Sequence, residues 1–392
     1  MVDFNALFGG GPNEDETKVS VDVDKVTIAG VEQYKVTLAI ASVSKNILWY
    51  AMKHFFDNGG GTCYVVSVAA FKDPYKAELS AGVKVLEDFD EPTMLLCPEA
   101  SRLADSGSAN EVMRNMILQA STLKDRSALV DVFDVVPDLA TPKLSIDKDV
   151  KDFRDTIGVI NLEGRYAAAY YPNLETTYPY NFDFETIKIK TYKEGGITPN
   201  PTPIADGIVL GDPSLKGSVV YNAIKTALES KHVILPPSAA IAGVITSVDN
   251  TRRYWKAPAN ATVKNVVRPT IILSDRQQDS LNIDVMAGKS VNVIRQFPGY
   301  GNIVWGARTL DGNSNEWRYV NVRRFFMVVE ESIKKSINWA VFEPNTAQTW
   351  VLVQSMVENY LFLKWRDGAL AGTKSEDAYY VKVGINKIAF PQ

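Results

Sequence analysis

Between residues 63 and 171 the chain alternates between short apolar runs and longer amphipathic runs. The short runs have the length and composition of buried strands, whereas the longer runs repeat their apolar residues at helical spacing. Such alternation builds βαβ units, which give a mostly parallel sheet with helices on its faces. The expected strands are 63–68, 93–97, 127–136 and 165–171, and the expected helices are 46–56, 78–89, 110–123 and 146–157.

The segments outside this unit are less regular. Apolar and polar residues alternate over 19–28, as expected for a half-exposed strand. Residues 173–212 are rich in Tyr, Pro and Gly, which predicts an irregular insertion with one short exposed hairpin strand at 186–192. Beyond it we expect helices at 219–228 and 240–249, a helix or turn at 277–285, strands at 233–238, 263–273 and 378–385, and a β-hairpin of 291–296 with 303–308.

Two long helices are expected near the C-terminus. Apolar residues recur at helical spacing over 320–337 and again over 345–366. Pro344 cannot continue the first helix, Asn345 is a good N-terminal cap for the second, and Gly368 suits its C-terminal end. Nothing in this pair resembles an active site. We interpret it as a rigid packing and docking unit.

Length and composition indicate the class of protein. The 392 residues suffice for two domains, which we place at 1–239 and 240–392. The net charge of −4 is spread along the chain, which argues against a nucleic-acid partner. There is no secretory leader pattern and no apolar run long enough to cross a bilayer, so we expect a soluble protein without membrane insertion, made in a cytoplasm. Cys63 and Cys97 lie in apolar runs and are interpreted as reduced core residues.

Candidate chemistry is sparse because the chain has only two histidines, His54 and His232. A Ser-His-Asp triad can be drawn from Asp131, one of these histidines and Ser238, but Ser238 follows two prolines rather than a nucleophile elbow. The histidines and cysteines have no metal-ligand spacing. The glycines at 59–61 follow a helix and precede a strand, which is the wrong order for a phosphate loop. We therefore expect no enzyme, and no catalytic, cofactor-binding or metal site.

Two other hypotheses remain open. One is a degenerate α/β hydrolase, which requires Asp131, a histidine and a serine within hydrogen-bond reach. The other is a small-molecule or sugar-binding module on the aromatic loops, which requires an apolar pocket lined by Tyr178, Tyr180 and Tyr192.

Basic residues gather around the expected hairpin and the first of the two long helices. Paired or stacked arginines of this kind either hold a structure together or bind an anionic partner. The cluster contains Arg295, Arg308, Arg318, Arg323 and Arg324 with Trp305 and Trp317, and its candidate ion-pair partners are Asp311, Glu316, Glu330 and Glu331. Lys334, Lys335, Lys364 and Arg366 are expected on solvated helix faces. Structural ion pairing is the main interpretation, and docking against an acidic partner is the alternative.

Several separated motifs together resemble the sheath protein of contractile tails, a family found in phage tails, R-type bacteriocins and extracellular contractile injection systems. The motifs occur in the family's order and cover most of the chain except 173–212. They are FFDNGGGTCYVVSV at 55–68, LPPSAAIAGVITSVDNTRRYWKAPAN at 235–260, VNVIRQFPGYGNIVWGARTL at 291–310, EWRYVNVRRFF at 316–326, VFEPN at 341–345 and LFLKWRDGALAGTKSEDAYYVKVG at 361–384.

The resemblance implies a structural subunit rather than an enzyme. The implied fold is α/β and α+β: a subtilase-like, mostly parallel sheet flanked by helices, plus a C-terminal α+β sheath domain with two long helices. Such a subunit would be made in a bacterial host cytoplasm, stack with other sheath subunits in hexameric rings around an inner tube protein, meet baseplate and terminator proteins, and contract to drive the tube through a target envelope. The helix at 345–366 is the expected tube-facing element, and the candidate interface residues are Lys334, Lys335, Lys364, Arg366, Arg323 and Arg324.

The chain departs from the family pattern at both ends. Family members begin with a segment like PGVYIEE well before the FGG motif, which lies here at 8–10, and continue beyond the VKVG motif at 381–384. Those arms are what neighbouring subunits exchange when they add strands to each other's sheets. The resemblance therefore implies a core fragment without its linker arms, which we expect to be monomeric or weakly associated on its own.

Overall fold

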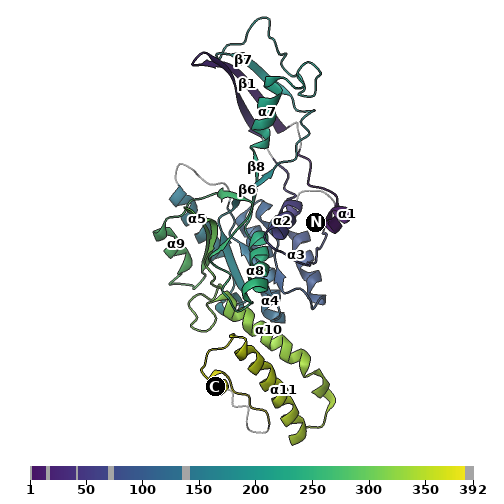
Figure 1. Cartoon of the computed structure of the whole chain (residues 1–392), viewed down its shortest axis with the longest axis vertical. Coiled ribbons are helices and arrows are strands. Elements are labelled where there is room, and N and C mark those ends of the chain that lie inside the picture. Colours follow the sequence, from purple (N-terminus) through teal and green to yellow (C-terminus); the bar gives the residue numbers. More distant parts are fainter. Residues whose placement is uncertain (1, 15–17, 41–42, 69–74, 135–141, 385–392) are drawn as a thin grey trace.

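The computed structural model describes residues 2–14, 18–40, 43–68, 75–134 and 142–384. The chain is elongated, with three parts arranged along its long axis (Figure 1). A small sheet with one helix lies at one end, and an α/β body occupies the middle. A pair of long helices extends from the opposite end, so that it projects away from the body.

The body is built on a six-stranded sheet with the order β3-β4-β5-β11-β12-β9. The four parallel strands are β3 (Met94–Leu95), β4 (Ser127–Asp131), β5 (Ala167–Tyr171) and β11 (Val291–Phe297), and the antiparallel strands β12 (Gly301–Trp305) and β9 (Ala261–Thr262) complete the sheet. This arrangement confirms the predicted fold class. The sheet takes strands from both sides of the predicted boundary at 239/240, and that division stays a prediction, as does the likeness to subtilases.

Helices cover both faces of this sheet because successive residues of a buried strand point to opposite sides. In β5, Ala167, Ala169 and Tyr171 join one apolar core, whereas Ala168 and Tyr170 join another. The first core contains residues of α3 (Lys76–Val85), α4 (Ser106–Leu123) and α5 (Pro142–Thr156), and the second contains residues of α2 (Leu48–Asp57) and α8 (Ser238–Arg252). Every residue of β4 and β5 is buried, which explains why these strands are continuous apolar runs in the sequence.

Side-chain caps fix where several helices begin. The Asp105 carboxylate accepts a hydrogen bond from the Ser108 N–H at 2.8 Å, which starts α4. The Ser218 hydroxyl accepts from the Tyr221 N–H at 3.1 Å at the start of α7 (Val219–Glu229). Each cap satisfies a backbone donor that the first turn of a helix leaves free.

The small part at the far end contains a three-stranded sheet in the order β2-β1-β7. β1 (Val19–Ile28) and β2 (Val31–Ile40) form an antiparallel hairpin, and β1 runs parallel to β7 (Ile189–Glu194). The helix α7 (Val219–Glu229) shares an apolar core with this sheet. A second sheet, in the order β10-β6-β8, is formed by Val266–Pro269, Leu174–Pro179 and His232–Leu235, and β6 and β8 lie between the small part and the body (Figure 1).

The remaining elements are short, apart from the two long helices described below. They are α1 (Val2–Phe8), η2 (Leu86–Asp88), η3 (Pro98–Arg102), α6 (Asn161–Gly164), α9 (Asp275–Asn282) and α12 (Ser375–Ala378). Most expected helices and strands lie within a few residues of their predicted positions. The strand expected at 127–136 ends at Asp131, and residues 135–136 lie outside the described part of the chain.

Several expectations from the sequence are wrong. Residues 63–68 form no strand, and Cys63 is exposed rather than buried, although both cysteines are free thiols and Cys97 packs against the core as expected. The expected strand at 378–385 is absent over 379–384, and residue 385 lies outside the described range. The insertion 173–212 is more regular than expected because it contains β6. Its expected exposed hairpin strand is instead β7, which pairs in parallel with β1 and buries Ile189 and Tyr192. No strand was expected at β2, which alternates exposed and half-buried residues because only one of its faces packs on the core.

Candidate assembly surface

The helical pair at the end of the molecule consists of α10 (Val320–Ser336) and α11 (Ala347–Arg366), joined through the 3₁₀ turn η4 (Asn338–Phe342). α11 begins at Thr346, whose hydroxyl accepts from the Thr349 N–H, so the predicted cap at Asn345 is wrong by one residue. The Asn345 side chain instead accepts from the Trp350 indole N–H at 2.6 Å. Gly368 has a φ of +85° just beyond the last turn, which confirms its predicted role at the C-terminal end.

The start of α10 is anchored to the body by two buried arginines. Arg324 is 9% exposed, and its guanidinium donates to both carboxylate oxygens of Asp249 in α8, with an Nη1–Oδ1 distance of 2.9 Å. Arg323 is 4% exposed and donates to Glu330 at 2.8 Å. Its guanidinium also lies 4.6 Å from the centres of the Tyr166 and Trp317 rings. Both arginines therefore serve intramolecular contacts.

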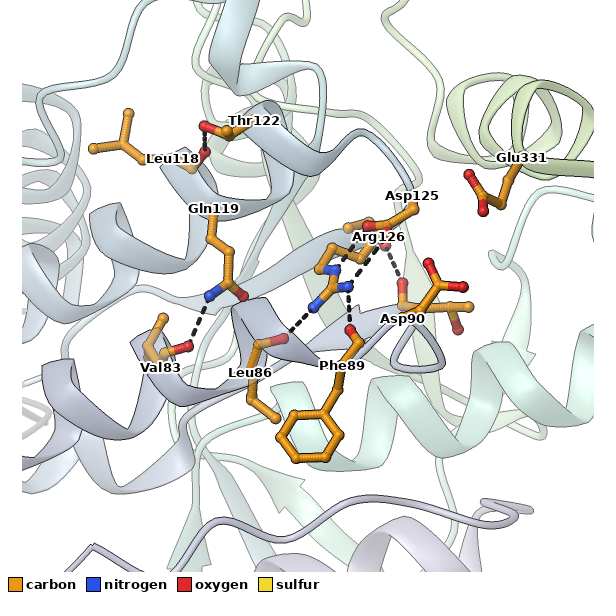
Figure 2. Close-up of polar contacts among 12 residues, drawn as sticks. Val83, Leu86, Phe89, Asp90, Leu118, Gln119, Thr122, Asp125, Arg126 and Glu331 are labelled. Carbon is orange, nitrogen blue, oxygen red and sulfur yellow. Dashed lines mark hydrogen bonds and ion pairs between the residues drawn. The ribbon is translucent and has the colours of Figure 1, made fainter. Parts of the chain in front are cut away.

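A third contact joins the other half of α10 to the body, and it depends on the hydrogen bonds of Arg126 that Figure 2 shows. The side chain of Arg126 is 1% exposed and donates to the carbonyl oxygens of Leu86 and Phe89 at 2.7 and 2.6 Å, and to Asp125 at 2.7 Å. These bonds hold the turn after α3 in place. The next residue, Asp90, is then 2.6 Å from the Lys335 ammonium, and this pairing raises the pKa of Lys335.

The other basic residues of the cluster have partners that the sequence only partly predicted. Arg323 with Glu330 was among the expected pairs, whereas Arg295 pairs with Asp275 at 2.7 Å. Arg308 lies over the Tyr319 ring at 5.9 Å, and Arg318 lies over the same ring at 5.8 Å. Asp311 lies 3.9 Å from Arg165, which is outside the predicted cluster. These contacts favour the structural interpretation of the arginines.

The remaining candidate interface residues lie at the surface of the helical pair. Lys334 is 3.4 Å from Glu331, and the Lys364 ammonium lies over the rings of Tyr254 and Tyr360. Arg366 is exposed in the last turn of α11, and within the described residues it has no ion-pair partner. The candidate interface residues therefore divide into two buried arginines and four surface cations.

Apolar side chains on the helical pair are exposed as well. Within the described ranges, α11 has no buried residue along its length, and Phe342 in the connecting turn is 98% exposed. The exposed large apolar residues of the pair are Phe326, Trp339, Val341, Phe342, Val351, Leu352, Met356, Phe362 and Leu363. The sequence carried a signal for this surface, because α11 has apolar residues all around its circumference rather than along one stripe. Such a surface is typical of a helix that packs against a partner.

The residues of the hypothetical catalytic triad do not come together. The Ser238 N–H at the start of α8 donates to the Asp131 carboxylate at 2.8 Å, so these two residues do meet. His54 lies elsewhere and donates through Nε2 to the Lys264 carbonyl oxygen at 2.9 Å. His232 is 3.6 Å from Glu175. Since these are the only histidines in the chain, no histidine can activate Ser238 and the hydrolase hypothesis has no support.

The aromatic residues proposed for a ligand pocket belong to apolar cores instead. Tyr178 is buried and donates to Asp57 at 2.6 Å, and Tyr192 is buried in the core of the small sheet. Tyr180 packs beside both of these cores. Over the described ranges, no group of three or more metal-ligating side chains gathers, and no helix is both long and apolar enough to span a membrane.

Three buried ionisable groups of the body have strongly shifted pKa values. Burial raises the pKa of the Asp131 carboxyl to about 7. Burial and the neighbouring Asp134 raise the pKa of Asp149 to about 7. Burial lowers the pKa of His54 to about 4. A raised pKa means that the folded state binds the proton more tightly than the unfolded state. The free energy of unfolding therefore falls as the pH rises from the unfolded pKa to the folded pKa.

Replacing Asp131 with asparagine is expected to flatten one part of this pH dependence. Asparagine keeps an oxygen for the Ser238 N–H but does not titrate, whereas folding of the wild type favours the protonated carboxyl between pH 4 and 7. The stability of the variant relative to the wild type should therefore rise by about 4 kcal/mol from pH 4 to pH 8. Urea unfolding at several pH values measures this difference, from which the titrations of Asp149 and His54 cancel. A difference independent of pH would contradict it.

Comparisons with known proteins agree on one type of subunit. The chain is 29% identical to a subunit of the contracted helical sheath of the anti-feeding prophage, with a TM-score of 0.59. This match covers 90% of our chain and 76% of the prophage chain. It is 27% identical to a subunit of the contracted sheath complex of the extracellular contractile injection system PVC, with a TM-score of 0.57. That match covers 88% of our chain and 72% of the PVC chain. The fold is thus that of a contractile sheath subunit.

Family models place the chain more specifically. The model of the phage tail sheath protein central domain matches residues 139–310, and that of the phage tail sheath C-terminal domain matches residues 313–388. The two matches together cover more than half of the 392 residues, and the chain belongs to the phage tail sheath family. The tail sheath proteins of Enterobacteria phage T4 and Vibrio phage KVP40 are 27% and 26% identical to it over 130 residues. Each match spans 32% of this chain and 19% of the relative's length.

Proposed function

We propose that this chain is a structural subunit of a contractile tail sheath, which polymerises around an inner tube and contracts to drive that tube through a target envelope. The match to two successive sheath domains carries the proposal. The uncovered apolar surface of the helical pair supports it, because a subunit of a polymer exposes in isolation what it buries in the assembly. Because both histidines bond to residues other than Ser238, the structure offers no catalytic triad, which supports the proposal that the protein is not an enzyme.

The proposed partners are those of a sheath in a particle. They are other sheath subunits in hexameric rings, an inner tube protein, and baseplate and terminator proteins, and the subunit is made in the cytoplasm of a bacterial host. Similar solved structures support this proposal, since they come from assembled sheaths and from the baseplate of the anti-feeding prophage. We also retain as a proposal the division into 1–239 and 240–392, in which the second part carries the helical pair.

We propose further that the tube-facing surface lies at the basic end of α11. Lys364 and Arg366 occupy its last turn, and Lys334 and Lys335 occupy the last turn of α10. Arg323 and Arg324 are buried and contribute indirectly, because they hold α10 in position. Surface cations of this kind increase the rate of association with an acidic partner and fix its orientation, and salt weakens their effect.

Reversing Lys364 and Arg366 to glutamate is expected to weaken assembly of the sheath on the tube. The double variant exchanges two positive charges for two negative ones at the proposed contact, so co-production with the tube protein should yield at least tenfold fewer sheathed tubes by electron microscopy. In the wild type, the yield of sheathed tubes should fall as the salt concentration is raised, because salt screens the attraction between the basic residues and the tube.

A matched control carries the same charge change far from this surface. Lys190 and Lys193 are exposed on β7 in the small sheet at the other end of the molecule, and their reversal to glutamate should leave assembly unchanged. Normal particles from the Lys364 and Arg366 variant would contradict the proposed surface. Failure of the full-length protein, with its linker arms, to assemble with the tube protein would contradict the proposed function itself.

A further inference from the structure

Lys364 differs from the other surface cations of the helical pair, because two aromatic rings hold its side chain. The ammonium lies 5.6 Å from the centre of the Tyr254 ring and 5.2 Å from the centre of the Tyr360 ring. Tyr360 precedes Lys364 by four residues, so both lie on the same side of α11. Tyr254 follows α8 in the body. The two rings, which we call the aromatic seat, therefore join the last turn of α11 to the body.

The Tyr254 ring of the aromatic seat is itself held by the start of α10. It stacks on Phe325, with the ring centres 6.1 Å apart and an angle of 19° between the planes. The next residue, Trp255, lies edge-on to Tyr254, with the ring centres 4.9 Å apart. The Trp255 carbonyl oxygen accepts a hydrogen bond from the Asn321 side chain of α10 at 3.0 Å. The position of the seat is therefore set by the same part of α10 that Arg324 anchors to α8.

Lys364 keeps its positive charge in the aromatic seat. Aromatic rings attract a cation through their quadrupole and supply no negative charge that would neutralise it. Among the described residues, no carboxylate pairs with Lys364, whereas Lys334 and Lys335 both pair with Glu331. Lys364 is also half-buried, which removes part of its hydration. This ammonium is therefore an oriented donor with which a carboxylate on another protein can pair.

The surface next to Lys364 is apolar. Leu363 and Phe362 precede it and are exposed, and Met356, two turns earlier on the same side of α11, is exposed as well. A protein that covers these side chains excludes water from the ammonium, and an ion pair is stronger where water is excluded. Residues that dominate a binding free energy are commonly surrounded by contacts that exclude water. Lys364 is therefore placed to make a contact of this kind.

We propose that the aromatic seat orients Lys364 toward an aspartate or glutamate carboxylate of the inner tube protein, and that Tyr254 and Tyr360 are positioning residues for this contact. This role of the seat rests on the proposed function, in which the basic end of α11 faces the tube. A lysine whose side chain is held before binding loses less conformational entropy when the ion pair forms than a lysine that is free in solvent. Arg366 is exposed and adds charge, whereas Lys364 fixes the orientation of the tube protein.

Replacing Tyr254 with leucine tests the proposal in the sheath assembled on its tube. Leucine removes the ring from the seat but keeps an apolar side chain against Phe325. Co-production of the full-length variant with the tube protein should yield about fivefold fewer sheathed tubes by electron microscopy, although the net charge is unchanged. Tyr254→Phe restores the ring and should restore the yield. Tyr221→Leu is the matched control, because Tyr221 is half-buried on α7 at the other end of the molecule (Figure 1).

A double-mutant cycle with Lys364→Met separates positioning from a structural role of the ring. Methionine keeps most of the apolar stem of the lysine side chain but carries no charge. If Tyr254 acts through Lys364, Tyr254→Leu should cause no further loss of sheathed tubes in the Lys364→Met background. An equal fold loss in both backgrounds would overturn the proposal, because the ring would then act through the fold of α10 alone. Tyr360→Leu, which changes a half-buried residue of α11, provides the same cycle if Tyr254→Leu fails to fold.

The same assay distinguishes a failure of the aromatic seat from a failure of the proposed function. Wild-type yields from both Tyr254→Leu and Tyr360→Leu would overturn the role of the seat and leave the proposed function in place. Failure of the full-length wild-type protein to assemble with the tube protein would overturn both. Normal assembly of the wild type, with a loss in the leucine variants that depends on Lys364, would show that the seat positions the cation that the tube recognises.

Discussion

Replacing Arg324 with alanine is expected to lower the free energy of unfolding by about 3 kcal/mol. The arginine is 9% exposed and donates to both carboxylate oxygens of Asp249, which lies 75 residues earlier in the chain. Its removal leaves a carboxylate in a mostly desolvated position without its counter-charge, and that cost exceeds the value of the lost contact itself. The helical pair also loses its connection to α8. Urea or guanidinium unfolding measures the change.

The control for this prediction is Lys334→Ala. Lys334 lies 3.4 Å from Glu331 on an exposed helix face, and pairs of this kind contribute about 0.5 kcal/mol or less. A double-mutant cycle with Asp249→Ala isolates the pair, since the second substitution should cost much less once Arg324 is gone. If Arg324→Ala costs less than about 1 kcal/mol, the start of α10 is not anchored by this pair.

Local sequence patterns predicted most of the fold, because the composition and spacing of apolar residues in most elements reflect how those elements are buried. β4 and β5 are buried on both faces and consist of short apolar runs, and the helices between them repeat at helical spacing. The start of α11 was predicted to within two residues because Pro344 ends one helix and a polar cap begins the next. In these cases the residues that determine an element lie inside it or next to it.

The sequence failed where a residue's environment is determined by a distant segment. Residues 63–68 have the composition of a buried strand, but strand pairing depends on β3, which lies about thirty residues later in the chain. Arg324 was grouped correctly with other basic residues, yet its partner Asp249 lies on another helix and has no periodic relation to it. The exposed and half-buried residues of α11 could not be told apart in the sequence, because both sets include apolar residues.

Replacing Gly243 with alanine is expected to destabilise the body by about 3 kcal/mol, although glycine to alanine ordinarily stabilises a helix by about 1 kcal/mol. Gly243 is buried in α8 where that helix crosses the end of α2. A Cβ atom there would lie 2.4 Å from the Phe55 carbonyl oxygen and 2.8 Å from the Asn58 Cβ. The first of these is a backbone atom in the last turn of α2, so the clash cannot be relieved by a rotamer change.

Neither α2 nor α8 can move away from this contact at a low cost in free energy. The Asn58 side chain donates to the His54 carbonyl oxygen and accepts from the Lys264 N–H at 2.8 Å, so it is fixed at both ends. The two helices would have to separate, which opens gaps in the core that they share with β5. Gly107→Ala serves as the control, because an added Cβ at this exposed position of α4 meets only the end of the Asp105 side chain. That variant should change the free energy of unfolding by about 0.5 kcal/mol or less. Equal effects of the two substitutions in thermal or chemical unfolding would mean that α2 and α8 are not in close contact at Gly243.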